Sequence, residues 1–131
     1  MRGKTFFIIN QYSSTPERGI GGRHYYLARE LVNLGHKVYL IAASNTHLLR
    51  NPHNLRNDCK LENISGLKFL WIKTSKYKYA KDKKRIWNWF VFALKLLKLP
   101  KIAPDKPHAI LYSSPSLISF LSAFYLAKKF N

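Results

Sequence analysis

The sequence predicts an α/β fold in which a parallel sheet is flanked by helices, and two observations lead to it. Short runs of β-branched and aromatic residues lack the polar alternation of a half-exposed strand, which is typical of strands buried on both faces. These runs alternate along the chain with longer segments whose apolar residues recur at helical spacing. The chain has 131 residues, of which 47% are hydrophobic and 22% charged, and therefore suits one folded domain.

The first strand–helix–strand unit is the clearest part of the pattern. Thr5–Asn10 and Lys37–Ala43 are the two apolar strands. A loop rich in turn-forming residues, 11–22, leads from the first strand into a helix over 23–34. Gly35 follows the helix, where a left-handed capping residue belongs. The length of this unit suits one right-handed parallel crossover.

The remaining chain continues the alternation, with two more strands and two more helices. We expect a polar loop over 44–60, a third strand over 67–72 and a basic loop over 73–85. An apolar helix over 86–99, ended by Pro100, and a turn-rich connector over 101–107 follow. A fourth strand over 108–112 leads into a last helix from Ser114 to about Lys129.

The glycines between the first strand and the first helix carry the most chemical information. Glycine lets a ligand approach the backbone closely, and the start of a helix offers free N–H groups and a partial positive charge to a phosphate. The run Gly19-Ile20-Gly21-Gly22 has neither the dinucleotide spacing, because His24 stands where a glycine is needed, nor a Walker A lysine. Two interpretations stay open on spacing alone, a diphosphate site or a loop whose glycines serve only turn geometry.

The segment Asn10–Ser44 resembles the opening of retaining family-four glycosyltransferases with the GT-B fold, and among them the WbuB-like group of bacterial surface-polysaccharide enzymes. Three patterns carry the likeness: P-E-x-G-x-G-G-R-H-Y-Y, L-A-x-E-L-x-x-x-G-H-x-V and I-A-A-S-x-x-H. The stretches Gly66–Tyr77 and Tyr112–Ser116 extend it over most of the chain.

The resemblance implies a Rossmann-like parallel sheet with flanking helices, the amino-terminal and acceptor-side half of a GT-B enzyme. It implies that residues 1–131 are part of that domain and that the chain ends before the carboxy-terminal domain, which holds most of the nucleotide sugar. Gly21 and Gly22 then match the loop that approaches the donor diphosphate. The reaction is sugar transfer from a nucleoside diphosphate donor with retained anomeric configuration, without a metal ion or other cofactor. We expect the fragment alone to be inactive, because stabilising the leaving diphosphate and orienting both substrates needs both domains.

Further candidate residues lie at the start of the first expected helix or after the ends of expected strands. Arg23 directly follows the glycines and is a third candidate for the donor diphosphate, since a guanidinium pairs well with phosphate. His24, at the same helix start, is a candidate for acceptor binding. His47, Ser113 and Ser114 are further acceptor candidates, because open α/β sheets bind ligands at the carboxyl ends of their strands. Ser114 can equally serve as a helix cap. The catalytic residues are not identified, and the sequence shows no metal-binding carboxylate cluster.

The chain is strongly basic, with a formal net charge of +17 from 23 Lys and Arg against six acids. Such a chain is attracted to polyanions. Residues 68–106 hold 12 of the basic residues against two Asp and include the apolar helix. We expect this helix to contact an anionic membrane surface rather than only pack in the core, through these candidates: Trp87, Trp89, Phe90, Lys84 and Arg85.

The resemblance implies an undecaprenyl-diphosphate-linked acceptor in O-antigen, lipopolysaccharide or capsule synthesis, and with the basic, apolar helix it leads us to expect a peripheral protein at the cytoplasmic face of the inner membrane. The single cysteine, Cys59, permits no intrachain disulfide, as suits the cytosol, and no apolar run is long enough for a membrane span. Two alternatives stay open, a basic nucleic-acid-binding module in which tyrosines and tryptophans stack on bases, and an inactive truncated remnant. We expect no nucleic-acid partner.

Overall fold

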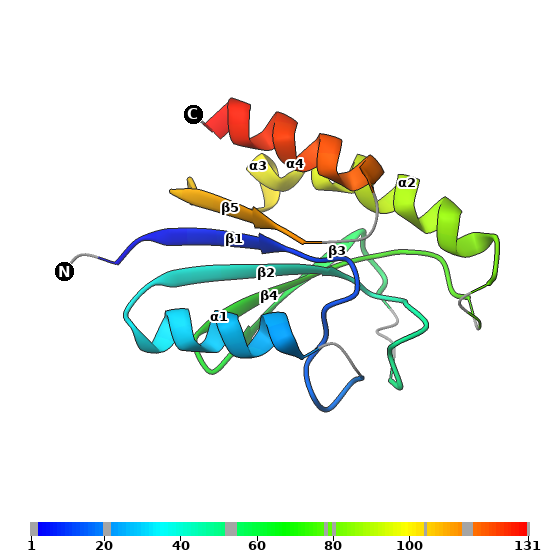
Figure 1. Ribbon diagram of the computed structural model, residues 1–131, viewed down its shortest axis with the longest axis horizontal. Helices are drawn as coiled ribbons and strands as arrows, with labels where there is room; N and C mark the ends of the chain where they lie inside the picture. The colour runs from blue at the N-terminus through cyan, green and yellow to red at the C-terminus, as the bar shows by residue number, and fades with distance from the viewer. Residues whose placement is uncertain are drawn as a thin grey trace.

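A computed structural model of the chain describes residues 3–19, 22–51, 55–77, 79, 81–103, 105–113 and 117–130. Within them, five strands form one mixed sheet in the order β3-β4-β2-β1-β5, and helices lie on both of its faces (Figure 1). The elements in chain order are β1 (Thr5–Ile9), α1 (Arg23–Asn33), β2 (Lys37–Ala43), β3 (Cys59–Ile64), β4 (Leu67–Ile72), α2 (Lys84–Leu96), α3 (Leu99–Ile102), β5 (Ala109–Tyr112) and α4 (Leu117–Phe130).

The expected α/β fold is confirmed, and four of the strands, β5, β1, β2 and β4, are parallel to one another. β1 lies between β2 and β5, and β2 lies between β1 and β4, with parallel pairing in each case. Ile9 is in register with Ile41 and with Tyr112, and Ala43 with Ile72. The carboxyl ends of these four strands therefore meet at one edge of the sheet.

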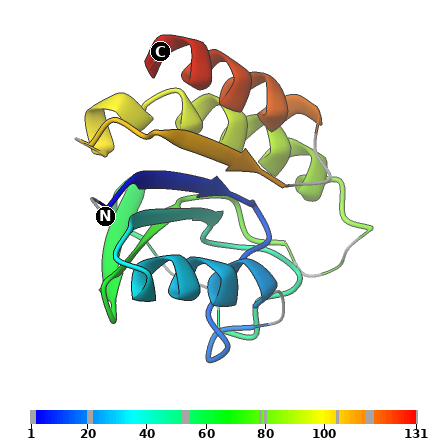
Figure 2. The ribbon, with the colours of Figure 1, turned by 60° about the vertical axis from the view of Figure 1, so that its left-hand side comes forward.

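Each face of the sheet is covered by its own helices, and alternate residues of one strand serve different faces. Phe7 and Ile9 of β1 pack in the cluster under α2 and α4, whereas Ile8 packs in the cluster under α1. Figure 2 shows α1 alone on one side and α2 with α4 on the other. The central strands are buried on both faces, which explains why they show continuous apolar runs without alternation.

The expectation of an all-parallel sheet with a loop up to Lys60 is wrong for β3. This strand pairs antiparallel with β4 and closes a hairpin through Ser65 and Gly66, both with positive φ (51° and 89°). β3 lies at the edge of the sheet, and each of its residues is exposed or half-buried. The strand is missed because an edge strand need not be apolar, and the CKLENI segment begins inside a polar stretch.

The single helix expected over 86–99 is two helices. α2 begins earlier, at Lys84, and ends at Leu96, and the short α3 follows with Pro100 in its first turn. Proline is tolerated there because a first-turn N–H has no partner within the helix. Pro100 therefore belongs to the start of α3 and does not simply end α2.

α4 packs against α2 through small side chains. Ser119, Ser122 and Ala123 are buried on α4, and the hydroxyl of Ser122 donates to the carbonyl of Ala93 on α2 (2.8 Å). Small residues at the contact allow the two helices to approach closely. Their larger side chains therefore point away from the contact, and several of them are exposed.

Candidate functional site

Polar residues follow each parallel strand at the carboxyl edge of the sheet, and most of them are buried. The segment after β1 contributes five buried polar residues, the segment after β2 three, and Thr74 follows β4. Ser113 follows β5 and is half-buried, and its N–H donates to the carbonyl of Ile9. This edge is where ligands of open α/β sheets bind. The buried polar residues are Asn10, Gln11, Ser13, Ser14, Thr15, Ser44, Asn45, Thr46 and Thr74.

Two of these segments are tied together and form a fixed support. The Thr74 hydroxyl donates to the carbonyl of Asn45 (3.1 Å), and the Asn45 amide donates to the carbonyl of Thr74 (3.1 Å). The backbone N–H of Thr74 donates to the Ser44 hydroxyl (3.1 Å). These buried bonds join the ends of β2 and β4 and so hold the loop that carries His47.

Asn10, directly after β1, holds the ring of His24 by a hydrogen bond. The Asn10 Nδ2 lies 3.1 Å from Nδ1 of the buried imidazole, while the Asn10 Oδ1 accepts the backbone N–H of Tyr12 (2.8 Å). Burial lowers the pKa of His24, and the positive charge of Arg23 lowers it further. A neutral ring can accept the hydrogen bond that Asn10 donates, so His24 joins α1 to the loop after β1.

The start of α1 has no side-chain cap. Gly22 is the N-cap residue, with φ −77° and ψ −5°, and the first turn holds no acidic residue. The four first N–H groups of a helix have no partner within it, so an uncapped start attracts an anion. Arg23 is exposed in the first turn. Gly21 and Ser114 lie outside the described residues, so their expected roles stay predictions.

An aromatic and basic cluster forms where Tyr12, in the loop after β1, meets Arg85 and Trp89 of α2. The Tyr12 hydroxyl accepts hydrogen bonds from Arg85 Nε (3.1 Å) and Trp89 Nε1 (2.8 Å), and the Arg85 guanidinium lies over both rings. The imidazole of His47 meets the Tyr12 ring edge to face, with centroids 5.6 Å apart. Its Nδ1 lies 3.1 Å from the Tyr77 hydroxyl.

Burial shifts the pKa of two groups in this cluster. It raises the pKa of Tyr77 to about 12, so its phenol keeps its proton. Burial, and then the charge of Arg85, lowers the pKa of His47, so its ring is neutral near pH 7. A neutral imidazole has one nitrogen that donates and one that accepts, and His47 is partly exposed, so its ring can hydrogen-bond a ligand.

Two of the membrane candidates face this cluster. Arg85 and Trp89 contact Tyr12, whereas Trp87, Phe90 and Lys84 are exposed on α2. Asn88 of the same helix is fully buried, and its amide binds both backbone groups of Ser75. The orientation of α2 was hidden in the sequence, since its apolar residues surround most of the helix.

The sequence patterns did not single out four residues of this site, Gln11, Tyr12, Ser13 and Tyr77. The signal that singled out His47, its position just after a strand, applies equally to the residues after β1. Gln11 and Ser13 are each 1% exposed, and their side-chain polar atoms have no hydrogen-bond partner within the described part of the chain. Nothing in the local sequence predicts that burial.

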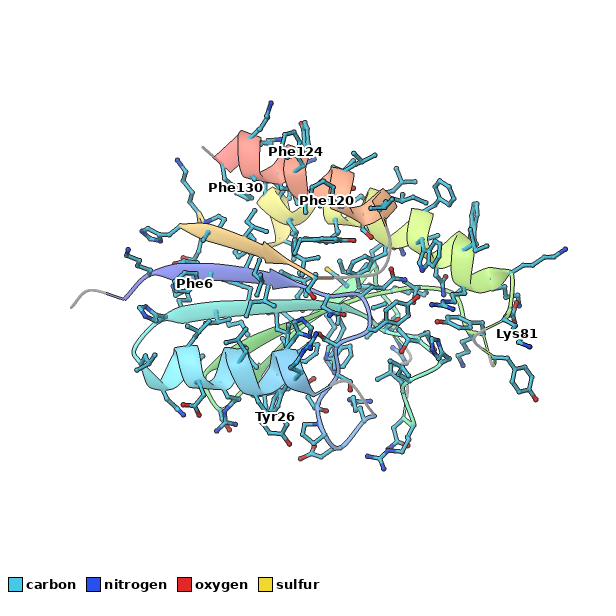
Figure 3. All side chains as sticks on the ribbon, in the orientation of Figure 1. Phe6, Tyr26, Lys81, Phe120, Phe124 and Phe130 are labelled. Atoms are coloured by element: carbon cyan, nitrogen blue, oxygen red, sulfur yellow. The ribbon has the colours of Figure 1, made fainter. Side chains whose placement is uncertain are left out.

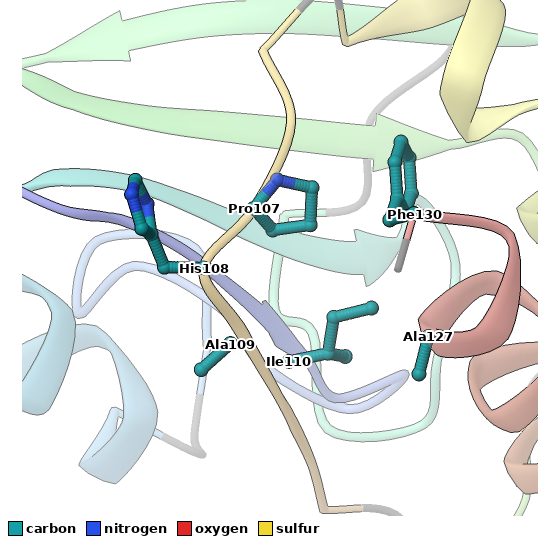
Figure 4. A pocket seen from close by; sticks show the side chains of 6 residues that line it. All are labelled: Pro107, His108, Ala109, Ile110, Ala127 and Phe130. Atoms are coloured by element: carbon teal, nitrogen blue, oxygen red, sulfur yellow. The ribbon is translucent and has the colours of Figure 1, made fainter.

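Another hollow lies away from this edge. It has a volume of about 110 Å³, lies at the amino end of β5, between the strand and the end of α4, and is lined by one prolyl ring, one phenyl ring, one imidazole and three aliphatic side chains (Figure 4). In that wall, Nδ1 of His108 already accepts the backbone N–H of Thr5 (3.0 Å). This hollow is at the opposite end of β5 from Ser113.

A metal-binding cluster and a membrane-spanning helix are both absent from the residues that the structure describes. These residues contain no group of three or more His, Cys, Asp or Glu side chains placed to hold a metal ion. None of the helices, over the residues described, has the length and apolar character needed to cross a membrane.

The structure defines an α/β protein with buried polar residues at the carboxyl edge of its parallel strands. Models of known protein families give no match to the chain, and neither do the curated proteins. Any function must therefore be inferred from the site and from the resemblance of the sequence motifs.

Proposed function

We propose that this chain is the acceptor-side part of a retaining, metal-independent glycosyltransferase that uses a nucleoside diphosphate sugar as donor. The observation that carries the proposal is the uncapped start of α1 at Gly22, next to the carboxyl edge of a parallel sheet. The motif resemblance over Asn10–Ser44 supplies the reaction class. Transfer would need the second domain, so the chain alone is expected to bind ligands without turning them over.

The donor diphosphate would lie against the first turn of α1. Backbone N–H groups there offer hydrogen bonds, and glycine at position 22 leaves the approach open. Arg23 adds a positive charge at the same turn. These groups would stabilise the negative charge that develops on the leaving diphosphate.

The acceptor would lie over the loop that carries His47. The partly exposed His47 and Tyr77 lie beside the buried Tyr12, and the bonds between Asn45 and Thr74 hold this loop in place. Neutral groups of this kind can hydrogen-bond a hydroxyl group without attracting the diphosphate away from α1. The catalytic groups remain unassigned.

Membrane association belongs to the same proposal. α2 and α4 lie side by side on one face of the sheet and expose large apolar side chains next to lysines. A lipid-linked acceptor at the cytoplasmic face of the inner membrane would be reached by such a face. The exposed apolar side chains of these helices are Ile86, Trp87, Phe90, Leu94, Leu117, Phe120, Leu121, Phe124 and Tyr125.

A titration with uridine diphosphate tests the donor site. Using the ¹⁵N-labelled chain, we expect saturable shifts of the backbone amides of residues 22–25. The Arg23→Gln variant should bind about threefold to tenfold more weakly, the range expected for losing one exposed charged contact of up to about 1.4 kcal/mol.

Arg29→Gln is the matched control, because it removes the same charge from the same helix at a distance from its start. Arg29 contacts the Tyr25 hydroxyl (3.2 Å). Equal weakening by both variants, or shifts spread over the basic surface, would mean that the nucleotide is held only by the net charge of the chain, and the proposal would fail.

A further inference from the structure

Gln11 and Ser13 place unused hydrogen-bonding capacity inside the candidate site. Gln11 Nε2, Gln11 Oε1 and Ser13 Oγ are buried without a hydrogen-bond partner, and among the described residues they are the side-chain atoms in this condition. Leaving a buried amide or hydroxyl unpaired is unfavourable, so such groups in a folded protein need an explanation.

Asn88 shows what a buried amide looks like when its role is structural. Its Nδ2 donates to the carbonyl of Ser75 (2.7 Å), and its Oδ1 accepts the N–H of the same residue (2.9 Å). Asn45 is likewise bonded to Thr74 and Ser44. The unpaired state of Gln11 is therefore not general for buried amides in this fold.

The backbone around Gln11 fixes where these groups lie. The carbonyl of Gln11 accepts the N–H of Ala43 (3.0 Å), and the N–H of Ser13 donates to the carbonyl of Asn10 (3.1 Å). Both residues are therefore held at the carboxyl ends of β1 and β2. Tyr12 stands between them in the chain and contacts His47 and Arg85.

The chemistry of the unpaired atoms restricts the ligand. The diphosphate linker of a nucleotide sugar carries no proton near neutral pH and offers only acceptors, so it could satisfy Gln11 Nε2 but would leave Gln11 Oε1 unpaired and facing a negative charge. A hydroxyl group both donates and accepts, and a sugar ring carries several at fixed spacing. The Ser13 hydroxyl can pair with such a group in either direction.

We propose that Gln11 and Ser13 bind the hydroxyl groups of a neutral sugar ring at the carboxyl edge of β1. This assigns a substrate class to the proposed glycosyltransferase site and rests on that function. The subsite is separate in chemistry from the start of α1, which would take the diphosphate.

The sugar reaches these atoms when the loop after β1 moves outward, because they are covered in the present conformation. The far part of that loop is joined to residues 49–51 by backbone and side-chain bonds. The carbonyl of Arg18 accepts the N–H groups of Arg50 (2.6 Å) and Asn51 (2.9 Å), Gly19 forms a β-bridge with Leu49, and Arg50 Nη2 donates to the carbonyl of Pro16 (2.9 Å). The loop and residues 49–51 would therefore have to move outward together.

Gln11 can be observed directly, because it is the only glutamine in the chain. Labelling the side-chain nitrogen of glutamine with ¹⁵N gives one pair of amide proton signals. The probes are the methyl glycosides of glucose, galactose, mannose and N-acetylglucosamine, together with inorganic phosphate and uridine diphosphate. We expect a saturable shift of the Gln11 pair with at least one glycoside and none with phosphate.

Three results would overturn the proposal. They are no response to any of the four glycosides, a response to phosphate alone, or strong transfer of magnetisation from a long-lived water molecule to the Gln11 pair that the glycosides leave unchanged. Uridine diphosphate is read at the backbone amides of residues 22–25. The donor site can thus fail while the sugar subsite holds, and the reverse.

Stability supplies a second measurement that does not depend on the glycosides chosen. Gln11→Met and Ser13→Ala remove unpaired groups at similar size, so each should keep or raise the Tm of the free chain, and Gln11→Met should abolish the shifts that a glycoside causes at neighbouring backbone amides. Asn88→Leu, which removes a fully paired amide, should lower the Tm. If Gln11→Met lowers the Tm as much as Asn88→Leu does, Gln11 is a structural residue and the proposal is wrong.

Discussion

At the scale of single residues, glycine in the loop after β1 serves two different purposes. A Cβ on Gly19 would lie 2.3 Å from the carbonyl oxygen of Leu48, so this glycine is required by the close approach of two backbones. A Cβ on Gly22 would meet only the ring of Tyr26, at 3.2 Å. The first glycine is required by the approach of two backbones, whereas the second is restricted only by one side chain.

The two histidines of the site lead to a prediction about pH. Burial is the larger cause of the lowered pKa of both His24 and His47, from an ordinary value of 6.5. Below that value the unfolded chain binds protons that the folded chain does not, so acid favours unfolding. We expect the Tm to fall as the pH is lowered from about 7 to about 5, the range in which histidine titrates.

Imidazole signals in NMR spectra and thermal unfolding would check this prediction. His24→Asn and His47→Asn should each make the Tm less dependent on pH in that range, because each removes one titrating group. An imidazole pKa above 6.5 for either residue in the folded chain would contradict the assignment of a buried, neutral ring.

At the scale of elements, α2 serves three surroundings at once. Phe92 and Leu96 pack in the core, Trp89 faces Tyr12 in the site, and Trp87 and Leu94 face outward. α4 lies beside it and adds its own outward aromatic residues. Figure 3 shows Phe120 and Phe124 on α4 on the opposite side of the sheet from Tyr26 of α1. The molecule therefore has an aromatic face on the side of α2 and α4.

This face leads to a prediction about membranes. Trp87 is 60% exposed and Leu94 66% exposed, so the double variant Trp87→Ser, Leu94→Ser should bind vesicles of phosphatidylglycerol and phosphatidylcholine at least tenfold more weakly. The lost insertion of two large apolar side chains is worth about 1.5–3 kcal/mol each when complete. Flotation on a density gradient measures the bound fraction.

Tyr26→Ser is the control, because Tyr26 is 59% exposed on the face of α1. It should bind vesicles as the unchanged chain does. Equal binding of the unchanged chain to anionic vesicles and to phosphatidylcholine alone would contradict the role of the lysines.

At the scale of the whole molecule, one carboxylate joins three distant parts of the chain. Asp105, in the connector before β5, accepts a hydrogen bond from the Tyr39 hydroxyl of β2 and forms ion pairs with Lys37 (3.1 Å) and Lys68 (3.9 Å). β5 is a short strand at the edge of the sheet and is paired only with β1 within the described residues. Asp105 thus fixes the entry to β5 against β2 and β4.

Replacing this carboxylate should weaken the sheet. The hydrogen bond from Tyr39, with the bond from Lys37, lowers the pKa of Asp105, so its stabilising effect is present above pH 3.8 and is lost as the pH falls through its lowered pKa. At neutral pH, Asp105→Asn should reduce the free energy of unfolding by about 1.5–3 kcal/mol, the usual range for a hydrogen bond to a charged group. Urea denaturation measures it.

Asp58→Asn is the comparison for this substitution. Asp58 also has two lysine partners, Lys95 (3.3 Å) and Lys98 (3.4 Å), but it lies at the surface, where water screens the pairs. It should change stability much less than Asp105→Asn. If both variants lose the same stability, the position of Asp105 between the strands has no special importance.

The sequence by itself determined the α/β class, the segments that form the four parallel strands and the position of the first helix. Continuous apolar runs such as Lys37–Ala43 report burial on both faces, and that signal is local. It also placed His24 at the start of the first helix and His47 just after a strand, where both are found. The hairpin of β3 escaped it, because an edge strand needs hydrogen bonds to a neighbour more than an apolar sequence.

Only the tertiary structure decided which side chains share a surrounding. Tyr12 meets Arg85 and Trp89, which follow it by more than 70 residues in the chain. No local pattern encodes such a contact, because it depends on how α2 crosses the face of the sheet. The same holds for Gln11 and Ser13, whose burial without partners arises from the packing of several segments around the ends of β1 and β2.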